Sequence, residues 1–116
     1  MNRRGYMGAD EIINWISTDL TLPELGVKNT VVMLSDGDTV PFISRYRKEK
    51  TGNLSEINVR DIADKLQYYI ELQTRKETIL SSIQEQKKLT PKLKKQIEEC
   101  KEKIKLEDIY LPYKPK

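Results

Sequence analysis

The sequence predicts an all-α fold, and three observations support this prediction. Charged residues make up 34% of the 116 residues and hydrophobic residues 37%, a balance that suits long solvated helices. Only five glycines and five prolines interrupt the chain, whereas a sheet protein with many turns uses more of both. Apolar residues recur at spacings of three and four, the repeat of an amphipathic helix. We expect about five helices, arranged as a small helical head followed by a long antiparallel helical hairpin.

Residues 9–20 predict the first helix. Two acidic residues, Asp10 and Glu11, stand at its N-terminal end, where the helix dipole is positive and favours them. Its apolar residues form one broad stripe that should face the core: Ile12, Ile13, Trp15, Ile16 and Leu20.

A second short helix should follow a turn. Residues 22–27 contain Pro23 and Gly26, which are typical of turns. The next residues are apolar at helical spacing, so Val31 and Leu34, together with Val27, should face inward.

The third predicted helix starts at residue 39 in the segment TVPFISRYRKEKTGNL. Thr39 occupies an N-cap position, and Pro41 falls in the first turn, where its missing N–H is harmless. At about 100° per residue, Phe42, Ile43 and Tyr46 span one arc of this helix. We therefore expect these three side chains to close the core of the head.

The same helix carries a cluster of cations that only Glu49 offsets within the segment. Arginines form two-pronged hydrogen bonds to carboxylates or phosphates, which makes this cluster a candidate for interdomain or phosphate contact. We favour docking to acidic groups of a domain that follows residue 116. The alternatives are pairing inside the head, with Asp36, Asp38, Glu56 or Asp61, and contact with a nucleic-acid backbone. The cluster consists of Arg45, Arg47, Lys48 and Lys50.

Ser55 predicts the start of a much longer helix that reaches about Lys88 without a glycine or proline. Gln73 and Lys76 interrupt its apolar stripe, so its inner face is only partly hydrophobic. The stripe consists of Val59, Ile62, Leu66, Tyr69, Ile70, Leu80 and Ile83.

Thr90 and Pro91 repeat the signal of a cap followed by proline and predict a last helix, which should pack antiparallel to the long one. Its apolar stripe is Leu93, Ile97, Cys100 and Ile104.

Residues 87–105 contain eight lysines against three glutamates, a net charge of +5. This region is a candidate nucleic-acid face, because a phosphate backbone would be attracted most strongly here. The alternative is a solvated helix face with Glu–Lys pairs, in which Lys94 and Lys101 flank Glu98 and Glu102. No aromatic residue lies among the lysines, so the region offers no base stacking. The lysines are Lys87, Lys88, Lys92, Lys94, Lys95, Lys101, Lys103 and Lys105.

The sequence does not favour an enzyme. Histidine is absent, and the chain has no nucleophile elbow, phosphate-binding loop or dinucleotide-binding glycine motif. Asp36 and Asp38 flank a glycine, a pattern that is far more often a helix-ending turn than a metal site. Cys100 is the only cysteine, which excludes an internal disulfide and favours a reducing, intracellular setting. We therefore expect no catalytic residue, no cofactor, no metal and no membrane segment.

Three parts are predicted along the chain. Residues 1–54 form a three-helix head, residues 55–105 the helical hairpin, and residues 106–116 an extended linker to a missing downstream domain. The linker prediction rests on the closing LEDIYLPYKPK, whose prolines cannot continue a helix.

Four segments in this order resemble the N-terminal region of the Tex family, the S1-domain transcription accessory proteins of bacteria and their eukaryotic S1 RNA-binding-domain relatives. The resemblance covers residues 25–116. The segments are TVPFISRYRKEKTGNL, VRDIADKL, ILSSIQEQKKLTPKLKKQIEECK and LEDIYLPYKPK.

The resemblance implies a much longer parent protein that acts in transcription or RNA metabolism. In that family a helical region like this one precedes a degenerate RNase H-like domain, helix-hairpin-helix elements and an S1 domain that supplies most nucleic-acid binding. The resemblance thus implies a scaffold or interaction module, with the parent's downstream domains, RNA or DNA through the S1 domain, and the transcription machinery as partners. The implied location is the cytoplasm in bacteria, and the nucleus or cytoplasm in eukaryotes.

Overall fold

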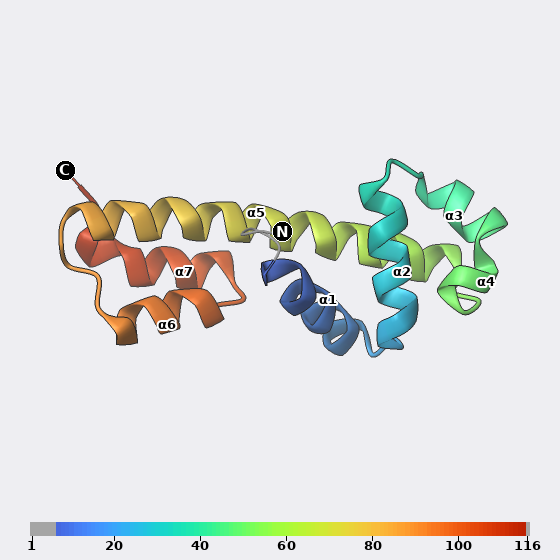
Figure 1. Cartoon of the computed structure of the whole chain (residues 1–116), viewed down its shortest axis with the longest axis horizontal. Helices are drawn as coiled ribbons and strands as arrows, with labels where there is room; N and C mark the ends of the chain where they lie inside the picture. Colours follow the sequence, from blue (N-terminus) through green and yellow to red (C-terminus); the bar gives the residue numbers. More distant parts are fainter. Residues whose placement is uncertain (1–6, 116) are drawn as a thin grey trace. The chain divides into compact units, whose positions relative to one another are not determined.

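The computed structural model describes the backbone of residues 7–115 and the side chains from Asp10 onward. Within these residues the fold is all-α, as predicted, and contains no strand. The elements are α1 (Met7–Leu20), α2 (Glu24–Ser35), α3 (Val40–Tyr46), α4 (Lys48–Thr51), α5 (Glu56–Glu85), α6 (Pro91–Glu99), α7 (Lys103–Tyr110) and the 3₁₀ turn η2 (Leu111–Tyr113) (Figure 1). No helix in this part of the chain combines the length and apolar character needed to cross a bilayer.

The chain divides into two compact units after Tyr68, so α5 supplies residues to both. The sequence placed boundaries after residues 54 and 105 instead. The limits 1–54, 55–105 and 106–116, as domain limits, stay predictions.

In the first unit, α2 lies against α1, α3 and α4. Ile12, Ile13 and Ile16 of α1 are buried as predicted, and Trp15 and Leu20 are half-buried. The predicted stripe of this helix is therefore confirmed.

The predicted turn at 22–27 is wrong beyond Pro23, because α2 already begins at Glu24. Gly26 is a buried residue of this helix and not a turn residue. A Cβ atom at Gly26 would lie 2.5 Å from the backbone oxygen of Thr51 in α4. Gly26 is thus needed for the close approach of two helices, a role that sequence alone did not reveal.

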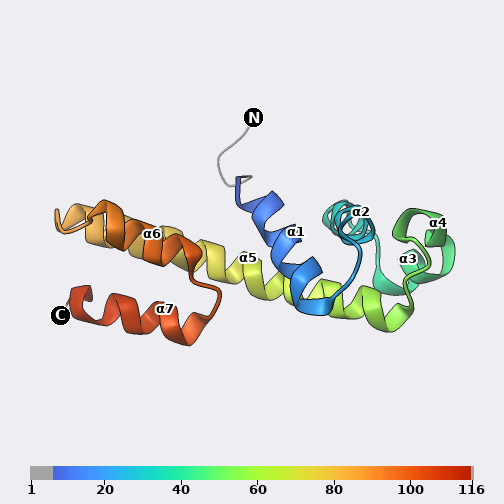
Figure 2. The same ribbon diagram turned by 90° about the horizontal axis from the view of Figure 1, so that it is seen from below.

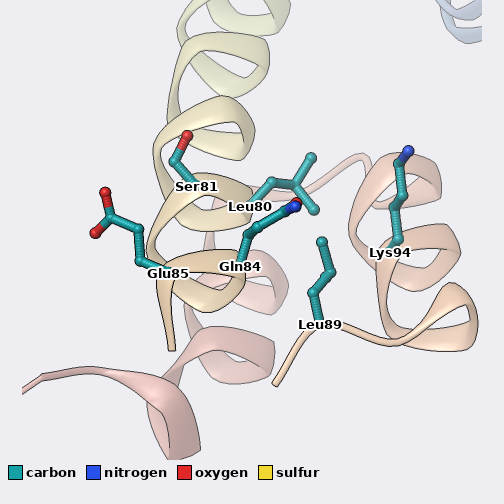
Figure 3. Close-up of a pocket in the computed structure, with 6 residues that line it drawn as sticks. All are labelled: Leu80, Ser81, Gln84, Glu85, Leu89 and Lys94. Carbon is teal, nitrogen blue, oxygen red and sulfur yellow. The ribbon is translucent and has the colours of Figure 1, made fainter. Parts of the chain in front are cut away.

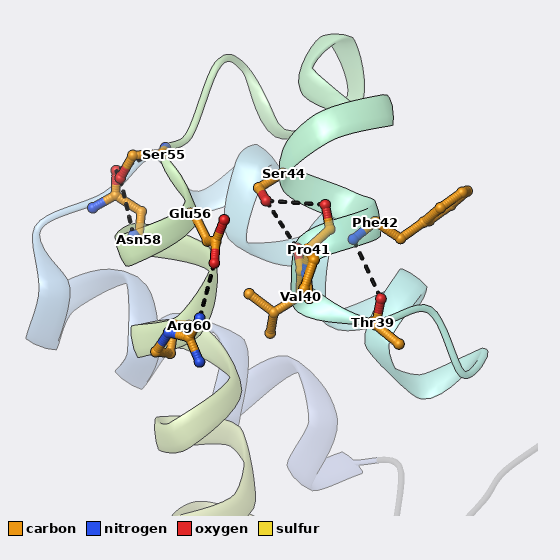
Figure 4. Close-up of polar contacts among 9 residues, drawn as sticks. All are labelled: Thr39, Val40, Pro41, Phe42, Ser44, Ser55, Glu56, Asn58 and Arg60. Carbon is orange, nitrogen blue, oxygen red and sulfur yellow. Dashed lines mark hydrogen bonds and ion pairs between the residues drawn. The ribbon is translucent and has the colours of Figure 1, made fainter.

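The third predicted helix is broken in two at Arg47, whose backbone angles, φ −128° and ψ 31°, are not helical. Its start is as predicted: the Thr39 hydroxyl oxygen accepts a hydrogen bond from the Phe42 amide at 3.2 Å (Figure 4). The two pieces, α3 and α4, both lie against α2.

The buried side of α3 differs from the predicted arc. Ile43 is buried as expected, but Tyr46 is 61% exposed and Phe42 only half-buried, whereas Ser44 is buried. The Ser44 hydroxyl donates to the carbonyl oxygens of Val40 and Pro41 at 3.0 and 3.2 Å (Figure 4). Because the helix itself satisfies this hydroxyl, the small serine can be buried and the bulky aromatic rings stay outside.

Helix α5 begins as predicted, with Ser55 as its cap. The Ser55 hydroxyl accepts from the Asn58 amide at 3.1 Å, and the Asn58 side-chain oxygen accepts from the Ser55 amide at 3.2 Å (Figure 4). This reciprocal arrangement satisfies two otherwise unpaired amides at the helix start.

The buried stripe of α5 agrees with the prediction only in part. Ile70 is 46% exposed, whereas Leu72 and Ile79, which the predicted stripe left out, are fully buried. Lys76, taken as an interruption, is only 1% exposed and belongs to the buried face. Four of the predicted members are buried, namely Val59, Ile62, Tyr69 and Ile83.

In the second unit, α6 and α7 lie alongside the C-terminal part of α5 (Figures 1 and 2). The Thr90 hydroxyl caps α6 by accepting from the Leu93 amide at 3.1 Å, and α6 returns antiparallel to α5 as predicted. The predicted continuous helix to Ile104 is wrong, because Cys100 is extended and a new helix starts at Lys103. Ile104 is consequently 78% exposed.

The extended stretch predicted from residue 106 is helical as far as Tyr110, and η2 follows. Leu106 and Tyr110 are buried, and the Tyr110 hydroxyl donates to the Ser82 hydroxyl oxygen at 2.9 Å. The prolines that suggested an extended chain come only after this anchored segment, at residues 112 and 115. Lys116 lies outside the described residues.

An ion pair joins α5 to α7. The Arg75 guanidinium donates to both carboxylate oxygens of Glu107, at 2.6 and 2.9 Å, and lies 5.4 Å from the centre of the Tyr110 ring. This hydrogen bonding lowers the pKa of Glu107 and raises the pKa of Arg75.

The Arg75–Glu107 pair should make the free energy of unfolding depend on pH in the acidic range. Because the folded pKa of Glu107 is below its unfolded value of about 4.3, the pair stabilises above that pH and loses its effect as pH falls through the lowered pKa. The side chains are 37% and 41% exposed, so we expect Glu107→Gln to cost only about 0.5–1 kcal/mol at neutral pH. Urea unfolding from pH 7 to pH 3 should show this cost disappearing.

The control for this prediction is Glu99→Gln, which removes an exposed carboxylate that has no ion pair among residues 10–115. A cost of Glu107→Gln that is the same at every pH would contradict a role for the ion pair.

Candidate interaction surfaces

The first candidate surface, which we name the α3–α4 surface, consists of the exposed and half-buried aromatic and cationic side chains of the two short helices. It combines two aromatic rings with four cations. Its residues are Phe42, Arg45, Tyr46, Arg47, Lys48 and Lys50.

The aromatic residues of this surface form a pair in which Tyr46 is exposed and Phe42 is half-buried. The ring centres of Phe42 and Tyr46 are 5.4 Å apart and the rings are tilted by 48°. The Arg47 guanidinium lies 4.9 Å from the centre of the Phe42 ring and donates to the Tyr46 carbonyl oxygen at 3.1 Å. Arg47 is half-buried, and among the described residues it is held by a ring and a carbonyl and not by a carboxylate.

Contacts between α2 and α4 fix the position of this surface. The Asn29 side-chain amide donates to the Lys50 carbonyl oxygen at 2.8 Å, and Gly26 lies directly against Thr51. After Thr51 the chain reverses at Gly52, whose φ of 76° lies in the left-handed region. The cationic side chains of α4 therefore extend from a backbone that is held against α2.

Pairing of the arginines inside the head does not occur in the part of the chain that the structure describes. Glu56 instead forms an ion pair with Arg60 at 2.9 Å (Figure 4). Arg45, Lys48 and Lys50 are exposed and make no ion pair among residues 10–115. Their charges thus remain available to a partner.

The predicted lysine face does not behave as one surface. Lys103 forms an ion pair with Glu71 at 2.7 Å, Lys105 pairs with Glu102 at 3.4 Å, and Lys101 is half-buried. The other five lysines are exposed and form no ion pair with the described residues. We name these the turn lysines: Lys87, Lys88, Lys92, Lys94 and Lys95.

The turn lysines do not serve to stabilise α6. The Lys94–Glu98 pairing expected of a merely solvated face is absent among the ion pairs of residues 10–115. Lysines also occupy the first half of α6 and glutamates its end, which is the unfavourable order for the helix dipole. These charges therefore weaken α6 slightly and are free to meet a negatively charged partner.

Sequence reasoning missed the aromatic half of the α3–α4 surface. It assigned Phe42 and Tyr46 to the core because they are apolar and share an arc with Ile43. Their spacing of four residues, with Arg47 immediately after, was the available signal, since such residues are neighbours on a helix surface.

Residues 10–84 match the family described as Tex-like protein N-terminal domain. The chain is 48% identical over 101 residues to transcriptional accessory protein Tex of Neisseria gonorrhoeae, covering 87% of this chain and 13% of that protein. It is 51% identical over 90 residues to protein YhgF of Escherichia coli, covering 78% of this chain and 12% of that protein.

A more distant relative is human S1 RNA-binding domain-containing protein 1. It is 30% identical over 86 residues, which is 74% of this chain and 9% of that protein. The chain thus spans about one eighth or less of the length of these relatives.

Proposed function

The chain belongs to the Tex-like protein family, whose N-terminal domain it contains, and from this premise we propose that it is a helical interaction module of a longer parent protein. The parent acts in transcription or RNA metabolism, inside the cell, in keeping with relatives called transcriptional accessory protein and S1 RNA-binding domain-containing protein. The module itself is not an enzyme. Its role is to hold other parts of the parent, and through them partners such as the transcription machinery.

The α3–α4 surface carries this proposal. Arginine and aromatic residues are enriched at the centres of protein interfaces, and here Arg45 and Tyr46 are exposed side by side in the sequence. Arg45, Lys48 and Lys50 have no ion pair among the described residues, so docking to acidic groups breaks no existing ion pair. Because the relatives are roughly eight times longer than the aligned region, we expect such acidic groups in other domains of the parent.

Charge reversal tests this proposal in the longer parent protein. We expect Arg45→Glu with Arg47→Glu to disrupt domain packing, measured as a larger radius in small-angle scattering and faster proteolysis between domains, with RNA affinity unchanged. Arg45→Glu alone should give a smaller effect of the same kind. This single variant is less disruptive to the fold of the head, because the exposed Arg45 side chain has no ion pair among residues 10–115.

The control for charge reversal is Lys28→Glu, an exposed position on α2. It should leave packing unchanged. Intact packing with weakened RNA binding in the arginine variants would refute the docking role and assign these residues to phosphate contact.

A second candidate function is weak, sequence-independent binding of RNA or DNA through the basic helices. The exposed, unpaired turn lysines favour it. If they neutralise phosphates, affinity should be no tighter than roughly 10⁻⁴–10⁻⁶ M at physiological salt and should weaken steeply as salt rises.

Titration of this chain with single-stranded RNA and duplex DNA at two salt concentrations measures that function. We expect weak or absent binding, since no aromatic lies among the turn lysines. Affinity of the order of 10 nM with a base preference, as in specific nucleic-acid complexes, would overturn the interaction-module proposal.

A further inference from the structure

A groove lies in the second unit between the end of α5 and the first half of α6 (Figure 3). Its volume is about 370 Å³. The lining residues are Leu80, Ser81, Gln84 and Glu85 of α5, Leu89 of the connecting turn, and Lys94 of α6.

Apolar side chains form the centre of the groove. Leu80 and Leu89 point into the space between the two helices, and Gln84 lies between them (Figure 3). Ser81 and Glu85 line the groove at its edge, but the ends of their side chains turn away from the two leucines (Figure 3). Both leucines are half-buried and would lose further contact with water if a side chain filled the space.

The surroundings of the groove are positively charged. Lys94 stands on the α6 wall, and the other turn lysines follow Glu85 and Leu89 in the sequence. The N-terminal end of α6 adds the positive end of a helix dipole to the same region. A ligand for this site therefore needs an aliphatic group for the leucines and negative charge around it.

We propose that this groove binds an acidic segment of a partner protein, with one aliphatic side chain between Leu80 and Leu89 and carboxylates facing the turn lysines. This site is distinct from the α3–α4 surface, which belongs to the other unit. A nucleic acid is the weaker fit, because no aromatic ring lines the groove to stack on a base and the leucines match an aliphatic side chain better.

Fluorescence anisotropy of the whole chain with a model ligand tests this site. The probe is a short fluorescein-labelled peptide of aspartates and glutamates with a central leucine, and the matched probe has serine in place of leucine. We expect the leucine peptide to bind at least about fivefold more tightly than the serine peptide, because only leucine gains from burial against Leu80 and Leu89.

Two substitutions in the protein locate the binding. Lys94→Glu should weaken the leucine peptide about threefold or more by charge repulsion. Leu89→Ser should remove the difference between the two peptides, with circular dichroism confirming that the helices persist. Lys28→Glu, in the first unit, is the charge control and should change nothing.

Three outcomes would overturn the proposal. The first is equal affinity for the leucine and serine peptides, which would leave only general attraction to acidic chains. The second is tighter binding of a labelled oligouridine than of the leucine peptide, which would assign the region to RNA. The third is no peptide binding up to about 1 mM, the weak end of measurable affinity. All three are independent of the result at Arg45 in the parent protein.

Discussion

Substitution of Gly26 by alanine is expected to destabilise the chain by about 1–3 kcal/mol through overpacking. The same change in an ordinary helix interior stabilises by about 0.5–1 kcal/mol. The sign of the change in unfolding free energy therefore distinguishes an overpacked position from an ordinary one. A Cβ at Gly26 would lie 2.5 Å from the Thr51 backbone oxygen and 3.4 Å from its carbonyl carbon. A backbone group cannot rotate aside as a side chain can, so α2 and α4 must separate.

That separation should also strain a neighbouring contact. Asn29, almost one turn further along α2, donates to the Lys50 carbonyl oxygen at 2.8 Å, and this bond lengthens if the helices move apart. We therefore expect Gly26→Ala to displace α4 and to weaken docking through the α3–α4 surface as well.

Urea unfolding measures the effect of Gly26→Ala. Leu25→Ala is the matched control, because Leu25 is 69% exposed on the same helix and should cost no more than about 0.5 kcal/mol. A Gly26→Ala protein more stable than the original chain would show that the close approach of α2 to Thr51 is not needed for folding.

Local signals in the sequence were sufficient for the helix starts. Thr39, Ser55 and Thr90 each cap a helix with a side-chain oxygen, because capping involves residues only three positions apart. The sequence also identified the buried side of α1, since Ile12, Ile13 and Ile16 share one apolar arc of the helix.

Features that depend on a second helix were not predictable in this way. Gly26 reads as a turn residue until Thr51 is placed against it, and Arg47 shows no sequence signal for the break between α3 and α4. The cations of the α3–α4 surface were predicted from the sequence, but Phe42 and Tyr46 were not. Both aromatic residues were assigned to the core because they are apolar and lie on the same arc as Ile43. Ser44 took that place because the helix satisfies its hydroxyl.

Lys76 is the clearest case of a polar residue whose role appears only in three dimensions. It is 1% exposed, and its ammonium donates to the Glu98 carbonyl oxygen at 2.7 Å. Glu98 lies in the last turn of α6, where carbonyl groups lack partners within the helix and the dipole is negative. A cation that reaches this point from α5 satisfies the helix end, and α6 indeed stops one residue later.

Lys76→Ala should therefore have the largest effect on stability, about 2–5 kcal/mol by analogy with truncation of a long buried side chain. Lys76→Met separates the contribution of packing from that of the hydrogen bond, because methionine keeps most of the packed aliphatic chain but cannot donate a hydrogen bond. We expect it to cost less, about 1–3 kcal/mol, the penalty for leaving the part-buried Glu98 carbonyl without this hydrogen bond. Lys92→Ala, at an exposed position of α6, should change stability by no more than about 0.5 kcal/mol.

The measurements for Lys76 are urea unfolding and hydrogen exchange of the amides around residues 97–100. If the ammonium holds the end of α6, both variants should exchange faster there, even where Lys76→Met retains most of the stability. A Lys76→Met protein as stable as the original chain, with unchanged exchange, would mean that desolvating the charge offsets its hydrogen bond. The end of α6 would then depend on the extended backbone of Cys100 and not on Lys76.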